Sequence, residues 1–205
     1  MSKANATRER LLSLGLDAIS VGGFSGVSLG ELADAAGMSK SGLFAHFQSK
    51  ERLQLDLLES MEQMAAAYIV GPAFAAPAGL PRLRAVVENW LGWSVRAGLR
   101  GGCPVAAALF ELDDLDGEVR AKVVAMEAQW RAQLRGLVDD AVARGHLNAS
   151  VDREQVVWEL CGIYLAHHVS SRLARDPQAR RRAIAAVDAL LDRAGAKTKT
   201  SRRFR

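Results

Sequence analysis

Apolar residues recur at helical spacing along almost the whole chain, and strict apolar–polar alternation is scarce. Leu11, Leu12, Leu16 and Ile19 mark the apolar face of the first such segment. Abundant Ala and Leu with few prolines favour helix over strand. The pattern predicts an all-α fold of about nine helices, over residues 4–20, 29–36, 40–47, 50–70, 82–99, 103–112, 117–144, 152–174 and 176–194.

The second and third predicted helices are short and carry clear end signals. Ser28 followed three residues later by Glu31 is a capping box for residues 29–36. Gly37 can end that helix in a left-handed conformation, and Ser39 can cap residues 40–47. Two short helices joined by a tight, glycine-containing turn are the plan of a helix-turn-helix, whose second helix enters the DNA major groove.

The residues of this stretch also resemble a known family. AGMSKSGLFAHF at residues 36–47, followed by SKE at 49–51, resembles the recognition-helix signature of the TetR family of bacterial transcriptional regulators. Phe24, Val27-Ser28 and Leu32-Ala33 also stand where that signature expects them. One departure is Phe44, where the family most often has Tyr. The missing hydroxyl removes a phosphate hydrogen bond, whereas the ring can still pack on a sugar or a thymine methyl.

We expect a DNA-binding surface built mainly on residues 40–47. Lys40 and Lys50 can reach phosphates or base edges, and Ser41 and Gly42 allow close approach because they carry little bulk. His46 is either a phosphate contact or a helix-end histidine favoured by the helix dipole. Arg8 lies near a phosphate by the resemblance, or is simply solvated. The full predicted set is Arg8, Ser28, Ser39, Lys40, Ser41, Gly42, Phe44, His46 and Lys50.

The basic composition does not by itself indicate nucleic-acid binding. The net charge is +4, but six positive charges without an accompanying acid stand near the C-terminus, at Arg193, Lys197, Lys199, Arg202, Arg203 and Arg205. Without these six charges the net charge is −2. We expect residues 195–205 to be a basic, disordered tail, with non-specific DNA or RNA contact as the alternative.

The remaining candidate chemistry is sparse. Cys103 and Cys161 lie in apolar surroundings and are expected to be small core residues in a reducing compartment. His167 and His168 are adjacent, so on a helix they diverge and cannot grip one ion. Five acids within residues 111–118 could bind a cation, but such residues more commonly end and cap helices. No cofactor motif is present, and we expect no metal site.

The chain lacks a secretory signal pattern and an apolar run of the ~20 residues that a membrane helix needs. We therefore expect a cytoplasmic protein without membrane contact. The Gly- and Pro-rich residues 71–81 interrupt the helical pattern. The expected organisation is a three-helix DNA-binding domain at residues 1–50, a helical ligand-binding and dimerisation domain at 51–194, and the tail. The resemblance implies a homodimer formed through the last two helices.

These observations favour a sequence-specific transcriptional regulator, a ligand-responsive repressor that binds a palindromic operator as a dimer. An apolar or amphipathic effector would be lined by large apolar residues of the middle helices, namely Trp90, Trp93, Phe110, Met126 and Trp130. Ordinary core packing is the alternative for each of them. A constitutive regulator without effector is the second hypothesis. An enzyme is disfavoured because no Ser-His-Asp set, phosphate loop or Glu-x-x-His pair is present.

Overall fold

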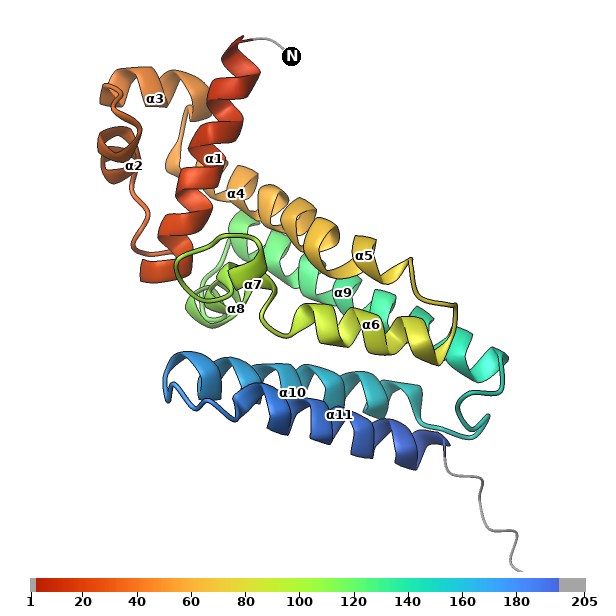
Figure 1. Ribbon diagram of the computed structural model, residues 1–205. Coiled ribbons are helices and arrows are strands. Elements are labelled where there is room, and N and C mark those ends of the chain that lie inside the picture. The colour runs from red at the N-terminus through yellow and green to blue at the C-terminus, as the bar shows by residue number, and fades with distance from the viewer. Residues whose placement is uncertain (1–2, 196–205) are drawn as a thin grey trace, which may run out of the picture. The chain divides into compact units, whose positions relative to one another are not determined.

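The computed structural model describes residues 3–195, and every regular element within them is helical (Figure 1). This confirms the predicted all-α fold. The elements are α1 (Lys3–Gly22), α2 (Leu29–Ala36), α3 (Lys40–Phe47), α4 (Lys50–Ala65), a π-helical turn η1 (Ala66–Val70), α5 (Gly71–Ala73), α6 (Leu80–Trp90), α7 (Trp93–Arg96), α8 (Pro104–Glu111), α9 (Glu118–Ala143), α10 (Arg153–Arg172) and α11 (Ala179–Gly195). None of these helices is long and apolar enough to cross a membrane.

The chain divides into two compact units. Residues up to 71 together with 92–130 form unit 1, and residues 72–91 together with those from 131 onward form unit 2. In unit 1 the buried side chains of α1–α4 are continuous with those of α8 and of the first half of α9, such as Ala108, Leu112, Val123 and Met126. The helix-turn-helix therefore shares its core with later helices.

The predicted end signals of α2 and α3 are confirmed. The Ser28 hydroxyl accepts the Glu31 N–H at 3.1 Å and the Glu31 carboxylate accepts the Ser28 N–H at 3.2 Å, which completes the capping box. Gly37 has φ 66°, the left-handed conformation that ends α2. Ser39 then caps α3 by accepting the Gly42 N–H at 3.1 Å. These local bonds set the turn that orients α3.

The helix predicted over residues 50–70 is present, but its last part is not α-helical. The Gly71 N–H bonds back to the Ala66 carbonyl, five residues earlier, which makes η1 a π-turn. Pro72 follows immediately and has no N–H to give to the carbonyl of Tyr68. The hydrogen bonds therefore change from a four-residue to a five-residue spacing before the proline, and the helix ends at Ala73.

The helix predicted over residues 82–99 is wrong in its second half. The α6 helix ends at Trp90, Leu91 turns to an extended conformation (φ −65°, ψ 109°), and Gly92 is left-handed with φ 75°. The Leu91 carbonyl accepts a hydrogen bond from Arg180 Nη1 at 2.8 Å, on α11 of the same unit. A partner 89 residues away stabilises this break. Helical periodicity cannot show such a contact.

Unit 2 is built from α6, the second half of α9, and the antiparallel pair α10 and α11, which run alongside each other in Figure 1. Side chains from the end of α9 and the turn after it cap the start of α6. Asp140 Oδ2 accepts the Gly79 N–H at 2.7 Å, and His146 Nδ1 accepts the Leu80 N–H at 3.1 Å. The two bonds satisfy backbone donors that begin a helix without an intrahelical partner.

The predicted tail falls mainly on residues 196–205, which lie outside the described residues. Its first residue, Gly195, is the last residue of α11. Arg193 lies in the last turn of α11, where its guanidinium donates to Glu159 at 2.6 Å. That positive charge therefore belongs to the helical part of the chain and not to the tail.

Candidate nucleic-acid interface

The α3 helix presents one apolar face to the core of unit 1 and one polar face to solvent. Leu43 and Phe47 are fully buried, whereas Lys40 and Ser41 are exposed. Phe44 is 53% exposed, a high value for an aromatic side chain that shares a helix with two core residues. The outer face of α3 thus offers a cation, hydroxyls and an aromatic ring, which suit phosphate, base-edge and thymine-methyl contacts.

Serine hydroxyls order the N-terminal end of this face. Ser39 Oγ lies 3.1 Å from Ser41 Oγ while it caps Gly42, so both hydroxyls are held in place. The Lys40 side chain lies over Gly30 of α2. Ser28 is exposed, but its hydroxyl is engaged with Glu31 on α2. Its geometry is that of a cap, and a DNA contact from Ser28 stays a prediction.

Three predicted contacts lie outside the first turns of α3. His46 is half-buried, with its ring centroid 6.4 Å from that of Phe47. Lys50 is exposed at the first position of α4, after the N-cap Ser49. Arg8 is not simply solvated, because its guanidinium pairs with Asp56 and lies 5.5 Å from the Phe47 ring centroid.

A contact that the sequence did not indicate holds the loop before α2. Glu111, the last residue of α8, accepts the backbone N–H groups of Phe24 at 2.9 Å and Ser25 at 2.8 Å. The acidic stretch was expected to end and cap its own helices. Instead its first carboxylate fixes a loop 86 to 87 residues away in the same unit. Only the folded chain brings these groups together.

The five predicted effector-lining residues differ in their surroundings. In unit 1, Trp93 and Met126 are buried, Trp130 is half-buried, and Phe110 is 60% exposed. In unit 2, the Trp90 ring stacks on that of Tyr164, with centroids 4.1 Å apart. The buried members make core contacts, and their part in effector binding stays a prediction.

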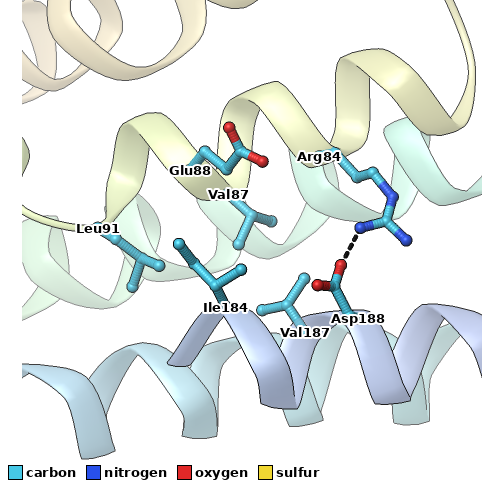
Figure 2. Close-up of a pocket in the computed structure, with 7 residues that line it drawn as sticks. All are labelled: Arg84, Val87, Glu88, Leu91, Ile184, Val187 and Asp188. Atoms are coloured by element: carbon cyan, nitrogen blue, oxygen red, sulfur yellow. Dashed lines mark hydrogen bonds and ion pairs between the residues drawn. The ribbon is translucent and has the colours of Figure 1, made fainter. Parts of the chain in front are cut away.

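A shallow groove in unit 2 lies between α6 and α11 (Figure 2). The space between its lining residues is about 220 Å³ when the adjoining open solvent is included. An ion pair between Arg84 and Asp188 closes one end. The lining residues are Arg84, Val87, Glu88, Leu91, Ile184, Val187 and Asp188. None of the predicted effector-lining residues belongs to this set.

The two adjacent histidines of α10 are half-buried. Burial, reinforced by the charge of Arg180 and by His168, lowers the pKa of His167 below its ordinary value of 6.5. Burial and the charge of Arg172 lower the pKa of His168 in the same direction. Within residues 3–195, no group of three or more His, Cys, Asp or Glu side chains is arranged to hold a metal ion.

These shifts predict a loss of stability on acidification. A lowered pKa means that the unfolded chain binds protons more readily, so stability is full above pH 6.5 and falls as the pH drops below that value. We expect the melting temperature to fall as the pH is lowered from about 7.5 to 5.5. Over this span of about two pH units most carboxylates stay ionised, because their pKa values are lower. In the variant His167→Gln/His168→Gln the decline should be shallower. An equally steep decline in that variant would assign it to other groups.

Two family matches cover most of the folded chain. Residues 11–57 match "Bacterial regulatory proteins, tetR family", and residues 79–187 match "Tetracyclin repressor-like, C-terminal domain". The chain belongs to the TetR family. It is therefore a DNA-binding transcriptional regulator, of a family made up of regulators rather than enzymes. The resemblance seen in residues 36–51 is confirmed.

The chain is also similar to individual proteins and solved structures. The transcriptional regulator AcuR of Cereibacter sphaeroides is 28% identical over 151 residues, 73% of this chain and 68% of AcuR. The nucleoid occlusion factor SlmA of Escherichia coli is 33% identical over 135 residues, 65% of this chain and 68% of SlmA. A TetR regulator from Chloroflexus aurantiacus superposes with a TM-score of 0.79 at 25% identity, covering 93% of this chain and 95% of that one. AibR, solved with isovaleryl coenzyme A and operator DNA, shares the fold at 21% identity with a TM-score of 0.67, over 96% of this chain and 100% of AibR.

Proposed function

We propose that this regulator is a cytoplasmic, ligand-responsive repressor that binds a palindromic operator as a homodimer. Residues 1–50 read DNA in this proposal, residues 51–194 bind the effector and dimerise, and the outer face of α3 enters the major groove. A two-fold dimer places two such helices about one helical turn apart, so the operator should contain two inverted half-sites.

The observation that carries the dimer is an exposed apolar stripe along α10 and its C-cap residue, Leu173. Trp158, Gly162, Ala166, Val169 and Leu173 follow one another at steps of four, four, three and four residues, and all are exposed. Trp158 is 64% exposed and Leu173 is 83% exposed. Residues at this spacing share one helix face, and a charge-free apolar stripe of this length suits a second helix pair. A second copy of α10 and α11 would bury it.

The effector is proposed to be amphipathic, with an apolar portion that contacts large side chains. AibR is a relative in fold whose structure contains an acyl coenzyme A, so acyl thioesters belong among the compounds to test. An effector acts only if it binds the DNA-free conformation better than the DNA-bound one, and a coupling of ~1–3 kcal/mol is ordinary. Phe110 is exposed, so it can line a site only where a ligand or another chain covers it.

A thermal-shift screen tests the effector directly. The purified protein is melted with a panel of apolar, amphipathic and acyl-thioester compounds. A compound that binds the folded state at a hundred times its Kd stabilises it by about 2.7 kcal/mol, which is a clear rise in melting temperature. We expect at least one such compound to release a duplex that the protein has selected from a random library.

The constitutive regulator is the competing hypothesis. It predicts that every compound leaves both the melting temperature and the complex with the selected duplex unchanged. A compound that raises the melting temperature without releasing the duplex would also contradict the ligand-responsive proposal, since binding would then be uncoupled from DNA.

A further inference from the structure

A carboxylate is buried beside the reading helix. The Asp56 side chain on α4 is only 1% exposed, and its neighbours Leu53 and Leu57 belong to the core of unit 1. Taking a charge out of water is costly unless other charges compensate it. An apolar side chain at this position would pack in the core without that cost. The presence of a buried acid therefore points to a role other than packing.

Two arginines compensate this carboxylate. Arg52 Nη2 lies 3.0 Å from Asp56 Oδ1, one helical turn away on α4, and the Arg8 guanidinium pairs with Oδ2 from α1. Among the described residues, neither oxygen has a hydrogen-bond partner of good geometry, so the two ion pairs are what compensates its charge. Arg8 also stacks over Phe47, the last residue of α3, at 5.5 Å. One buried charge therefore links α1, α3 and α4.

Both arginines keep part of their surface in solvent. The Arg8 side chain is 37% exposed and the Arg52 side chain is 55% exposed, so each can still meet a further anion. Arg52 lies in the first turn of α4, where the Ser49 hydroxyl accepts its N–H and the helix dipole also favours negative charge. A guanidinium has donors on more than one edge, so a carboxylate and a phosphate can bind it together.

We propose that Asp56 is a positioning residue for DNA binding, which holds Arg8 and Arg52 as a preset pair of phosphate contacts. Arg52 thereby joins the DNA-binding surface, although the sequence did not single it out. Arginines that are already fixed lose less side-chain freedom when a phosphate arrives. This inference rests on the proposal that α3 reads DNA, because the two arginines lie beside the end of α3.

Arg52→Ala tests the contact, because Arg8 remains to compensate Asp56. Affinity is measured against salt for the selected duplex and for a random-sequence duplex. The logarithm of the binding constant falls as the logarithm of the salt concentration rises. Each lost phosphate contact makes this slope less steep by ~0.9, hence by ~1.8 for a dimer that carries the change twice. Arg100→Ala is the matched control. Arg100 is also an exposed arginine paired with an aspartate, Asp17, and this change should leave the slope unchanged. An unchanged slope in Arg52→Ala overturns the inference.

Asp56→Asn tests the positioning role, since it removes the charge and keeps the shape. We expect affinity for the selected duplex to fall about ten-fold, from the cost of ordering the freed arginines. The salt slope should not fall, because both cations remain. Binding is measured well below the melting temperature, with the folded state checked by circular dichroism. Wild-type affinity, or a loss accompanied by a reduced slope, contradicts the positioning role.

Two variants distinguish an error in the role of the arginine pair from an error in the proposed DNA-reading role of α3. If Lys40→Ala/Phe44→Ala still binds the selected duplex, α3 is not the reading helix and the basis of the inference is lost. If that double variant loses binding while Arg52→Ala keeps the wild-type salt slope, α3 reads DNA and only the role of the arginine pair is wrong.

Discussion

Replacing Lys40 and Phe44 by alanine should abolish specific DNA binding while leaving the fold and the oligomeric state of the protein unchanged. Both side chains lie on the outer face of α3, and Phe44 is 53% exposed. A base contact contributes roughly 1–3 kcal/mol, and the proposed dimer would lose two side chains in each subunit. Four losses of about 1 kcal/mol each already lower affinity about a thousand-fold. The measurement is a titration of the selected duplex at fixed salt.

The controls for this variant separate reading from folding. Exposed substitutions ordinarily change stability by no more than about 0.5 kcal/mol, so the melting temperature and the mass by light scattering should match those of the wild type. Phe74→Ala/Arg181→Ala removes an exposed aromatic ring and an exposed cation from unit 2 and should retain DNA binding. If the Lys40 and Phe44 variant still bound the duplex tightly, the helix assigned to DNA reading would be wrong.

The sequence predicts the parts of the helix-turn-helix that depend on interactions between near neighbours in the chain. Ser28 with Glu31, Gly37, and Ser39 with Gly42 are interactions over one helical turn, so residue type and spacing determine them. The same applies to burial of Leu43 and Phe47 on one face of α3. Local chemistry is therefore sufficient to predict the helix-turn-helix and the outer surface that it presents.

Several features that the sequence does not predict depend on contacts between distant residues. The break after Trp90 is stabilised by Arg180, and the loop at Phe24 is held by Glu111. Asp56 resembles an ordinary surface acid, since Arg52 stands four residues before it, as in many exposed helix pairs. Its burial becomes visible only when α1 covers it and brings Arg8 to the same carboxylate. The contacts of Glu111 and Asp56 position the helix-turn-helix within unit 1. A helical pattern contains no information about any of these distant contacts.

The turn between α7 and α8 offers the second large effect, since we expect Gly101→Ala to destabilise the protein by about 3 kcal/mol. In unit 1 this turn packs directly on the end of α1. The Gly101 N–H donates to Ser20 Oγ at 2.9 Å, and the Gly102 N–H donates to the Ser20 carbonyl at 2.6 Å. A Cβ at Gly101 would overlap the Ser20 carbonyl and lie 2.5 Å from the Val21 nitrogen.

The obstacle at Gly101 is backbone, which cannot rotate away as a long side chain would. The turn must therefore move, which breaks both hydrogen bonds to Ser20. The same movement strains the neighbouring hydrogen bond from the Arg100 N–H to Asp17, which is 2.9 Å long. Each buried bond contributes about 1 kcal/mol. For a chain of this size a loss of 3 kcal/mol lowers the melting temperature by roughly 6–12 °C, which scanning calorimetry resolves.

Gly136→Ala is the matched control for the Gly101 change. Gly136 lies exposed within α9, and a Cβ there meets nothing within 4 Å. Alanine should raise stability by up to about 1 kcal/mol, because glycine is the poorer helix former. The same added methyl group thus has opposite effects at the two positions. A Gly101→Ala protein that melts like the wild type would mean that the turn does not hold α1 through these backbone bonds.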